Sequence, residues 1–204
     1  MYSFAAHPQT VTRSATGALP YLATRPVTLS GFSGAPDTLR EMVDAAQGDR
    51  GERSVVLRAL VEEITAGIWP KDYVGEILAI RNFAAEHIRY INDPQHVELV
   101  KSPQTIAEEF FERGIAVGDC DDIGCFISSS HLQLGRNCQI VAVGFGPAGH
   151  YTHVFERCQE PRTGVWVICD PVAGTREREM ARRATTWQIW SLDEPPSRGA
   201  VEER

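Results

Sequence analysis

The chain has 204 residues, a formal net charge of -7 and a sequence pI of about 5.4. Its hydrophobic fraction of 43% and charged fraction of 23% are ordinary for a soluble globular protein and indicate neither disorder nor a membrane class. An acidic chain without a basic run is a poor candidate for general nucleic-acid binding, because that binding depends on lysine and arginine to replace the counterions of phosphates.

The lack of a recognisable targeting signal and the pattern of cysteines lead us to expect a cytoplasmic protein. No stretch approaches the roughly 18 apolar residues that a membrane span needs, and residues 1–17 have neither a basic start nor an apolar block. The five cysteines are an odd number without paired CxxC spacing, and they lie at positions 120, 125, 138, 158 and 169. This pattern favours reduced thiols over a disulfide framework or a zinc ribbon, so we expect no metal and no cofactor.

Composition divides the chain into three parts. Residues 1–35 are rich in Thr, Ser, Gly, Ala and Pro without helical period, and we interpret them as an extended arm. This arm is either a loosely packed extension or a docking arm for a protein partner. Residues 36–192 form the expected domain, and residues 193–204 form a polar tail without periodicity.

Four helices are predicted before the first cysteine. The first opens at Pro36-Asp37 and reaches Gly48, and the second covers residues 53–68. The third is capped by Asp72 and extends to about Ile91. A short fourth helix begins at Ser102-Pro103 and closes at Gly114.

The stretch from Val117 to Ile127 predicts a cysteine at a helix start. Asp119 is a good N-cap residue and places Cys120 in the first turn, and the helix runs to Leu134 before Gly135 ends it. The helix dipole favours a thiolate there. Asp119, Asp121 and Asp122 oppose that effect by raising the pKa of the thiol, so a reactive Cys120 requires a cationic partner.

Short β-rich runs follow Gly135. They are predicted at residues 139–145, 151–156 and 165–169, with a further strand at residues 187–190. Both faces of these runs are apolar or aromatic, which predicts a sheet covered on both sides.

The predicted hairpin supplies the partner that Cys120 needs. A turn centred near Pro161 and Arg162 pairs residues whose numbers sum to about 323, which sets His153 opposite Asp170. Asp170 would then orient His153 and favour its imidazolium form, leaving the other ring nitrogen for the sulfur. We therefore predict a catalytic triad with Cys120 as nucleophile, His153 as general base and then acid, and Asp170 as orienting group.

Three blocks of the sequence resemble the transglutaminase-like cysteine peptidase superfamily, which is related in its core to papain-type folds. They are Gly118-Asp-Cys-Asp-Asp, Gly149-His-Tyr-Thr-His153-Val and Trp166-Val-Ile-Cys-Asp170-Pro, in the order Cys, His, Asp. The segments Tyr90-Ile-Asn-Asp-Pro and Lys101-Ser-Pro look like the version of this domain in bacterial and phage-encoded proteins. The resemblance covers about residues 77–172.

The resemblance implies an α+β fold with a papain/transglutaminase-like core, in which the nucleophile helix packs on an antiparallel sheet. It also implies acyl transfer or amide hydrolysis through a thioester, on a peptide or protein substrate, with no nucleic acid and no membrane. If the chain is phage-encoded, the virion is an alternative location to the cytoplasm. The first alternative to an enzyme is a catalytically silent structural or assembly protein that keeps the fold, and a less favoured one is a metal-binding protein.

Other candidate ligands have simpler interpretations. His150 and His153 are three apart on a predicted strand and point to opposite faces, so a metal site there is not expected. The three aspartates could bind calcium but are more simply interpreted as a helix cap and as partners of the helix dipole.

The remaining cysteines have no predicted role in catalysis. Cys125 is interpreted as a core residue, Cys169 as facing away from Asp170, and Cys138 and Cys158 as lacking a partner identifiable by spacing. His7, His87, His96 and His131 are interpreted as ordinary surface or helix histidines. Trp166 is expected either to shield the His–Asp pair or to pack in the core. The proposed oxyanion donor is the backbone N–H of Cys120.

Overall fold

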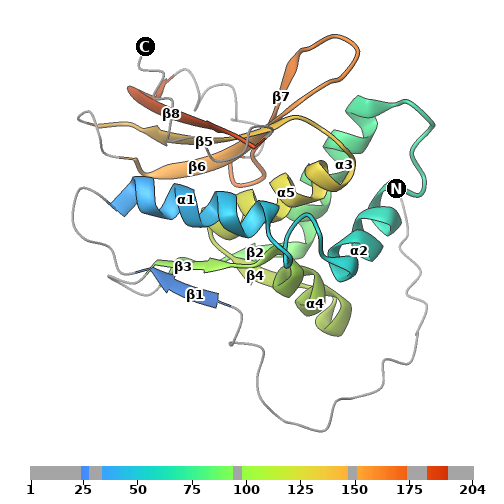
Figure 1. The fold of residues 1–204 in the computed structure, drawn as a ribbon, viewed down its shortest axis with the longest axis horizontal. Helices are drawn as coiled ribbons and strands as arrows, with labels where there is room; N and C mark the ends of the chain where they lie inside the picture. Colours follow the sequence, from blue (N-terminus) through green and yellow to red (C-terminus); the bar gives the residue numbers. More distant parts are fainter. Residues whose placement is uncertain (1–23, 28–33, 94–97, 147–150, 174–182, 193–204) are drawn as a thin grey trace, which may run out of the picture.

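The computed structural model describes residues 24–27, 34–93, 98–146, 151–173 and 183–192. These residues form an α+β fold with five helices and a four-stranded antiparallel sheet (Figure 1). The helices are α1 (Gly34–Gln47), α2 (Val55–Thr65), α3 (Tyr73–His87), α4 (Pro103–Arg113) and α5 (Cys120–Gln133). The strands are β1 (Thr24–Val27), β2 (Ile88–Tyr90), β3 (Glu98–Lys101), β4 (Ala116–Gly118), β5 (Cys138–Gly144), β6 (His153–Gln159), β7 (Trp166–Cys169) and β8 (Thr186–Ser191).

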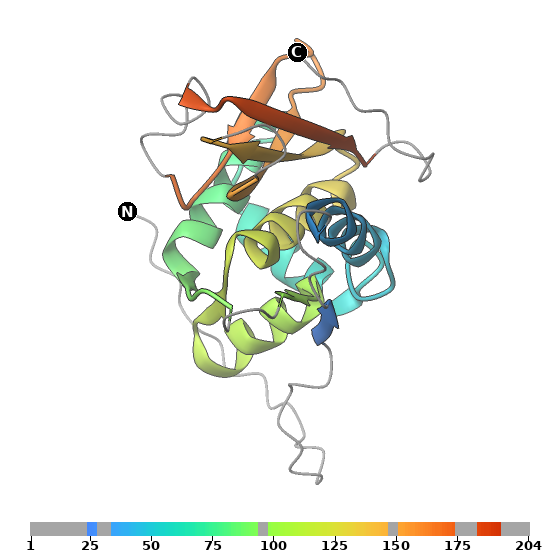
Figure 2. The same ribbon diagram turned by 90° about the vertical axis from the view of Figure 1, so that its left-hand side faces the viewer.

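The main sheet has the strand order β7-β6-β5-β8, and all its neighbouring strands are antiparallel. Figures 1 and 2 show the described helices on one side of this sheet, with α5 next to it. Helix α5 contacts β5 and β6 on its sheet side and α1, α2, α3 and α4 on its other sides. The cysteine helix is therefore the central element of the fold, and its N-terminal end carries Cys120.

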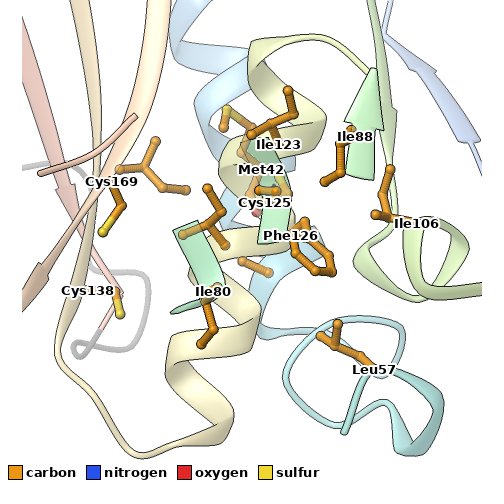
Figure 3. Packing of buried hydrophobic residues seen from close by; sticks show 14 of the residues in the cluster. Met42, Leu57, Ile80, Ile88, Ile106, Ile123, Cys125, Phe126, Cys138 and Cys169 are labelled. Atoms are coloured by element: carbon orange, nitrogen blue, oxygen red, sulfur yellow. Dashed lines mark hydrogen bonds between the residues drawn. The ribbon is translucent and has the colours of Figure 1, made fainter. Parts of the chain in front are cut away.

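The core lies between α5 and the surrounding elements, and Figure 3 shows part of it. Phe126 is fully buried on α5 and packs in a tilted arrangement against the ring of Phe83 on α3. Met42 of α1, Leu57 of α2 and Ile106 of α4 are also completely buried in the same cluster. Burial of each such side chain contributes about 1.5–3 kcal/mol, so these helices are joined to α5 by packing.

The opposite face of the sheet is apolar as well. Val141, Val143 and Phe155 are buried there and pack with Trp187 and Ile189. The expectation that residues on both faces of these strands are buried is confirmed for this part of the sheet.

The predicted helix starts at Asp72 and Ser102 are confirmed, and the second helix, predicted from residue 53, begins after an N-cap at Ser54. Ser54, Asp72 and Ser102 each accept a backbone N–H from three residues ahead through their side chains. Gly114 ends α4 with φ of 73°, a left-handed conformation that glycine adopts without strain.

The third helix ends earlier than predicted. Residues 88–90 form β2, which pairs in parallel with β4 and sets Tyr90 opposite Gly118. The helical spacing of Ile88 and Ile91 misled the prediction, because a β-branched residue fits a strand as well as a helix. This correction matters for the site, since it brings Tyr90 to the entry of α5.

Part of the predicted arm is described. Its residues 24–27 form β1, which pairs antiparallel with β3. Residues 1–23 of the arm and the predicted tail at 193–204 lie outside the described residues. Among the described helices, none has both the length and the apolar character that crossing a bilayer requires.

Candidate active site

Cys120 is the first residue of α5, as the sequence predicts. The Asp119 carboxylate accepts the backbone N–H groups of Asp121 at 3.1 Å and Asp122 at 3.5 Å, and Asp122 in turn accepts the N–H of Asp119 at 3.4 Å. This reciprocal arrangement is a capping box. It fixes the helix start, so the backbone N–H of Cys120 belongs to the first turn, where it has no acceptor within the helix.

The loop before Cys120 is held by a polar network that the sequence did not reveal. The Asp122 carboxylate accepts the backbone N–H of Lys101 at 2.5 Å. The Lys101 ammonium forms an ion pair with Glu109 at 3.2 Å, and Glu109 accepts the backbone N–H of Val117 at 3.1 Å. Lys101 and Glu109 thereby connect β3 and α4 to the strand that leads into Cys120.

The Cys120 thiol lies in a negatively charged environment. Its sulfur donates to the Asp121 carboxylate at 3.4 Å. Burial, followed by the charges of Asp121 and Asp119, raises the pKa of the thiol far above its ordinary value, and the backbone N–H of Val154 on β6 opposes this shift. In this arrangement Cys120 is a thiol at neutral pH.

Tyr90 also belongs to the site. Its hydroxyl forms a hydrogen bond with Cys120, and its ring is partly exposed on β2. Burial, with the charges of Cys120 and Asp119, raises the pKa of Tyr90 above its ordinary value, so its hydroxyl keeps its proton. The prediction of a helix over residues 88–91 concealed this contact, although Tyr90 begins one of the two upstream segments that look like the bacterial and phage-encoded version of the domain.

His153 and Asp170 are in direct contact. His153 Nε2 lies 2.8 Å from Asp170 Oδ2, and the Asp170 side chain is almost completely buried. Asp170 Oδ1 accepts the backbone N–H of Ala173 at 3.0 Å, which fixes the orientation of the carboxyl group. An ionised carboxylate can only accept, so the proton of this hydrogen bond belongs to His153 Nε2, and Nδ1 remains as the basic nitrogen.

The hairpin register differs from the predicted one by two residues. The ladder pairs Glu156 with Cys169 and Gln159 with Trp166, so the paired residue numbers sum to 325 rather than 323. The turn occupies residues 161–164, one residue later than assumed, because Gly164 takes a positive φ of 71°. A shift of two keeps side chains on the same face, so His153 and Asp170 meet along a diagonal instead of directly across.

Cys120 reaches the strand that carries His153 but is not bonded to the His–Asp pair, because the His153 ring lies with Phe155 on the sheet face away from α5. The Val154 N–H that contacts the sulfur belongs to the residue after His153. Among the hydrogen bonds of the described residues, the Cys120 thiol is directed to Asp121 and the His153 ring to Asp170. The structure thus brings His153 and Asp170 together, and it brings Cys120 to the same strand without a direct contact to the imidazole.

The remaining cysteines and Trp166 have positions away from Cys120. Cys125 is fully buried on α5, and Cys169 is buried on the α5 side of the sheet, both as expected. Trp166 pairs with Gln159 at the far end of the hairpin and lies under the Arg157 guanidinium at 4.7 Å, so it does not shield the His–Asp pair.

The histidines outside the pair were interpreted as ordinary surface or helix residues, and for His131 this interpretation is wrong. His131 is fully buried, and its Nδ1 forms a hydrogen bond with Glu156 Oε1 at 3.0 Å. His87 is half-buried against Phe83 and Phe110. His7, His96 and His150 lie outside the described residues.

Comparison with known proteins gives little beyond the fold just described. No family model matches the chain, and no curated protein sequence matches it. The fold of this chain is similar to the crystal structure of a "putative protease" from Parabacteroides distasonis, with a TM-score of 0.49 and 12% sequence identity. The match covers 84% of this chain and 30% of that chain, and a likeness at this score carries no argument about activity.

Proposed function

We propose that this chain is a thiol-dependent hydrolase or acyltransferase that acts on a peptide or amide bond through Cys120, His153 and Asp170. The observation that carries the proposal is the 2.8 Å contact between His153 Nε2 and Asp170 Oδ2. The next residue after His153, Val154, contacts the Cys120 sulfur through its backbone N–H. A histidine oriented by a buried carboxylate beside a cysteine at a helix start is the arrangement that nucleophilic acyl transfer uses. The proposal includes a transglutaminase-like core, in line with the sequence resemblance.

Each residue has one task in the proposed reaction. The Cys120 thiol gives its proton to His153 Nδ1, and the sulfur attacks the carbonyl carbon of the substrate. The backbone N–H of Cys120 stabilises the oxyanion, and the imidazolium then protonates the leaving amine. Water attacks the resulting thioester while His153 takes its proton, which releases the acid and restores the thiol. An amine in place of water would complete acyl transfer.

The proposal requires a rearrangement. The Cys120 thiol donates to Asp121 in this structure, and the His153 ring stacks on Phe155 on the sheet face away from α5, so both side chains must reorient before the sulfur can attack. Catalytic hydrogen bonds are often long or absent without substrate and tighten when it binds. Hydrolysis is preferred over transfer because the sequence has no feature that indicates a site for an acceptor.

The first test compares alkylation of Cys120 by iodoacetamide in the wild type and in Asp170→Asn. Cys120 is the one partly exposed cysteine of the five, so its reaction before the others reflects access and decides nothing. The informative quantity is the rate at pH 6.5, where a thiolate–imidazolium pair reacts and an isolated thiol does not. We expect Asp170→Asn and His153→Ala each to reduce the alkylation rate of Cys120 about tenfold or more. A tenfold reduction corresponds to an increase of about one unit in the pKa of the thiol.

The control is Asp49→Asn, which removes an exposed carboxylate paired with Arg53 elsewhere on the molecule. A Cys120 rate that is the same in wild type, His153→Ala and Asp170→Asn, with all three folded, contradicts the triad. Cleavage of a mixed peptide library gives the second readout, where Cys120→Ser should abolish turnover and Cys125→Ser should keep it.

One observation favours the alternative, a catalytically silent structural or assembly protein. The pKa of Cys120 is raised by burial and by Asp121, which describes an unreactive thiol. Under this alternative an activity-based thiol probe labels nothing, and Cys120→Ala leaves partner binding intact.

A further inference from the structure

A second cluster of chemically active side chains lies at the other end of α5. His131 of α5, Cys138 of β5, and Glu156 and Cys158 of β6 are all fully buried. One donor atom from each residue lies within 4.8 Å of the donor atoms of the other three. Cys120 and His131 are eleven residues apart on the helix, or about 16 Å at its ordinary rise, so this cluster is distinct from the candidate active site.

The main sheet places three of these residues on one face. Cys138 and Cys158 are directly opposite each other in the β5–β6 ladder, and their sulfurs are 4.0 Å apart. Glu156 is two residues before Cys158 on the same strand and therefore points to the same side. Figure 3 shows the Cys138 side chain on the sheet bordering the helical core. The α5 helix closes the cluster with His131, whose Nδ1 lies 3.0 Å from Glu156 Oε1.

The separations suit a tetrahedral ion. Zinc binds cysteine sulfur at about 2.3 Å and histidine nitrogen at about 2.0 Å, which sets two tetrahedral sulfurs about 3.8 Å apart. The two sulfurs stand close to that separation before any ion is present. The donor set of two thiols, one imidazole and one carboxylate suits zinc, because calcium and magnesium prefer oxygen ligands alone.

Two further observations point to a ligand. His131 Nε2 lies 3.3 Å from the carbonyl oxygen of Ile77, which can only accept, so Nε2 carries a proton and Nδ1 is the ring nitrogen that faces Glu156 and the cluster. A metal-bound histidine usually donates its other ring N–H in this way. Glu156 Oε2 is buried and has no hydrogen-bond partner, although such an oxygen costs free energy when it is left unsatisfied.

We propose that His131, Cys138, Glu156 and Cys158 bind one zinc ion in a closed structural site. Four protein ligands without access to solvent leave no open position for substrate, so the ion would join α5 to β5 and β6 rather than take part in a reaction. Binding releases the protons of both thiols, so affinity increases with pH. The sequence pattern did not reveal the site because its ligands come from three elements and include no CxxC pair.

The metal content of the full chain tests the proposal. Protein purified without chelator should contain about one zinc per chain by elemental analysis, and the Cys138→Ser/Cys158→Ser double variant should contain almost none. Glu156→Gln keeps the size of the side chain and the contact with His131, and it should weaken zinc binding at least tenfold in competition with a chromophoric chelator. The matched control is Cys125→Ser, a buried cysteine on α5 outside the cluster, which should keep full zinc content.

Cobalt substitution of the wild type decides the question if the variants fail to fold. Tetrahedral Co²⁺ bound by two thiolates gives intense visible bands and a near-ultraviolet sulfur-to-cobalt charge-transfer band, and zinc should displace both. Metal-free protein that takes up neither zinc nor cobalt overturns the proposal. So does equal zinc content in the double variant, because the ion would then lie elsewhere, and so does a Cys138–Cys158 disulfide in peptide maps of freshly prepared protein.

Discussion

At the scale of single residues, Cys120 is subject to two opposed influences. The dipole at the start of α5 and the backbone N–H of Val154 on β6 favour a thiolate. Burial and the carboxylates of Asp119 and Asp121 favour the thiol, and these are the larger influences. Both aspartates are buried, so solvent screens their charges less than it would on the surface. The reactivity of Cys120 therefore depends on how many of these carboxylates stay ionised and close.

Asp121→Asn should make Cys120 more reactive. The substitution removes the carboxylate that accepts the thiol proton at 3.4 Å and one of the charges that raise the thiol pKa. We expect the midpoint of the pH–rate profile for alkylation of Cys120 to move to lower pH by about one unit, so the rate at pH 8 increases several-fold. Asp49→Asn should leave the profile unchanged, and an unaltered midpoint in Asp121→Asn would show that Asp121 does not control the thiol.

At the scale of secondary-structure elements, the entry of α5 depends on a close approach between Gly118 and Asp122. A Cβ atom at position 118 would lie 2.7 Å from the Asp122 Cβ and 2.8 Å from its Oδ2. Asp122 cannot move away cheaply, because its carboxyl group accepts the backbone N–H groups of Lys101 and Asp119. Gly118 is therefore required by contact rather than by backbone conformation.

Gly118→Ala should destabilise the protein by about 1–3 kcal/mol, the usual effect of an added methyl group in a packed site. Urea denaturation measures this change. Gly67→Ala is the control, since a Cβ there meets nothing within 4 Å, and it should have little effect. The alanine at position 118 should also reduce the capping-box contact, so a thiol-reactivity change at Cys120 is expected in the same variant. Equal stability of the two variants would mean that the Asp122 contact relaxes without loss.

At the scale of the whole molecule, local signals predicted the elements better than the contacts between them. The caps at Asp72, Ser102 and Asp119 were readable because each side chain serves its own helix. The hairpin register was two residues off, yet it kept the faces of His153 and Asp170, because side-chain direction repeats every two residues.

Contacts made across the fold were missed. The parallel pairing of β2 with β4 brings Tyr90 to Cys120. The packing of α5 on the sheet brings His131 to Glu156 and to the two cysteines of the cluster. Neither arrangement has a fixed spacing in the sequence, because each depends on how distant elements pack.

The free energy of unfolding of the whole chain should depend on pH through the protonation of Asp122. Burial, then the charge of Asp119, raises the pKa of this carboxyl group from 3.8 to about 7, although the N–H and charge of Lys101 lower it in part. Between about pH 4 and pH 7 the folded protein therefore holds a proton that the unfolded chain has lost. Stability that comes from Asp122 is fully present near pH 4 and decreases as pH rises to 7.

Asn cannot titrate, so the free energy of unfolding of the wild type relative to Asp122→Asn should fall by about 2–3 kcal/mol between pH 5 and pH 8. Urea denaturation of both proteins at the two pH values measures this difference, with Asp49→Asn as the exposed control. A difference that stays constant with pH would mean that Asp122 is ionised throughout, and the Asp119–Asp122 capping box would then hold two buried negative charges side by side.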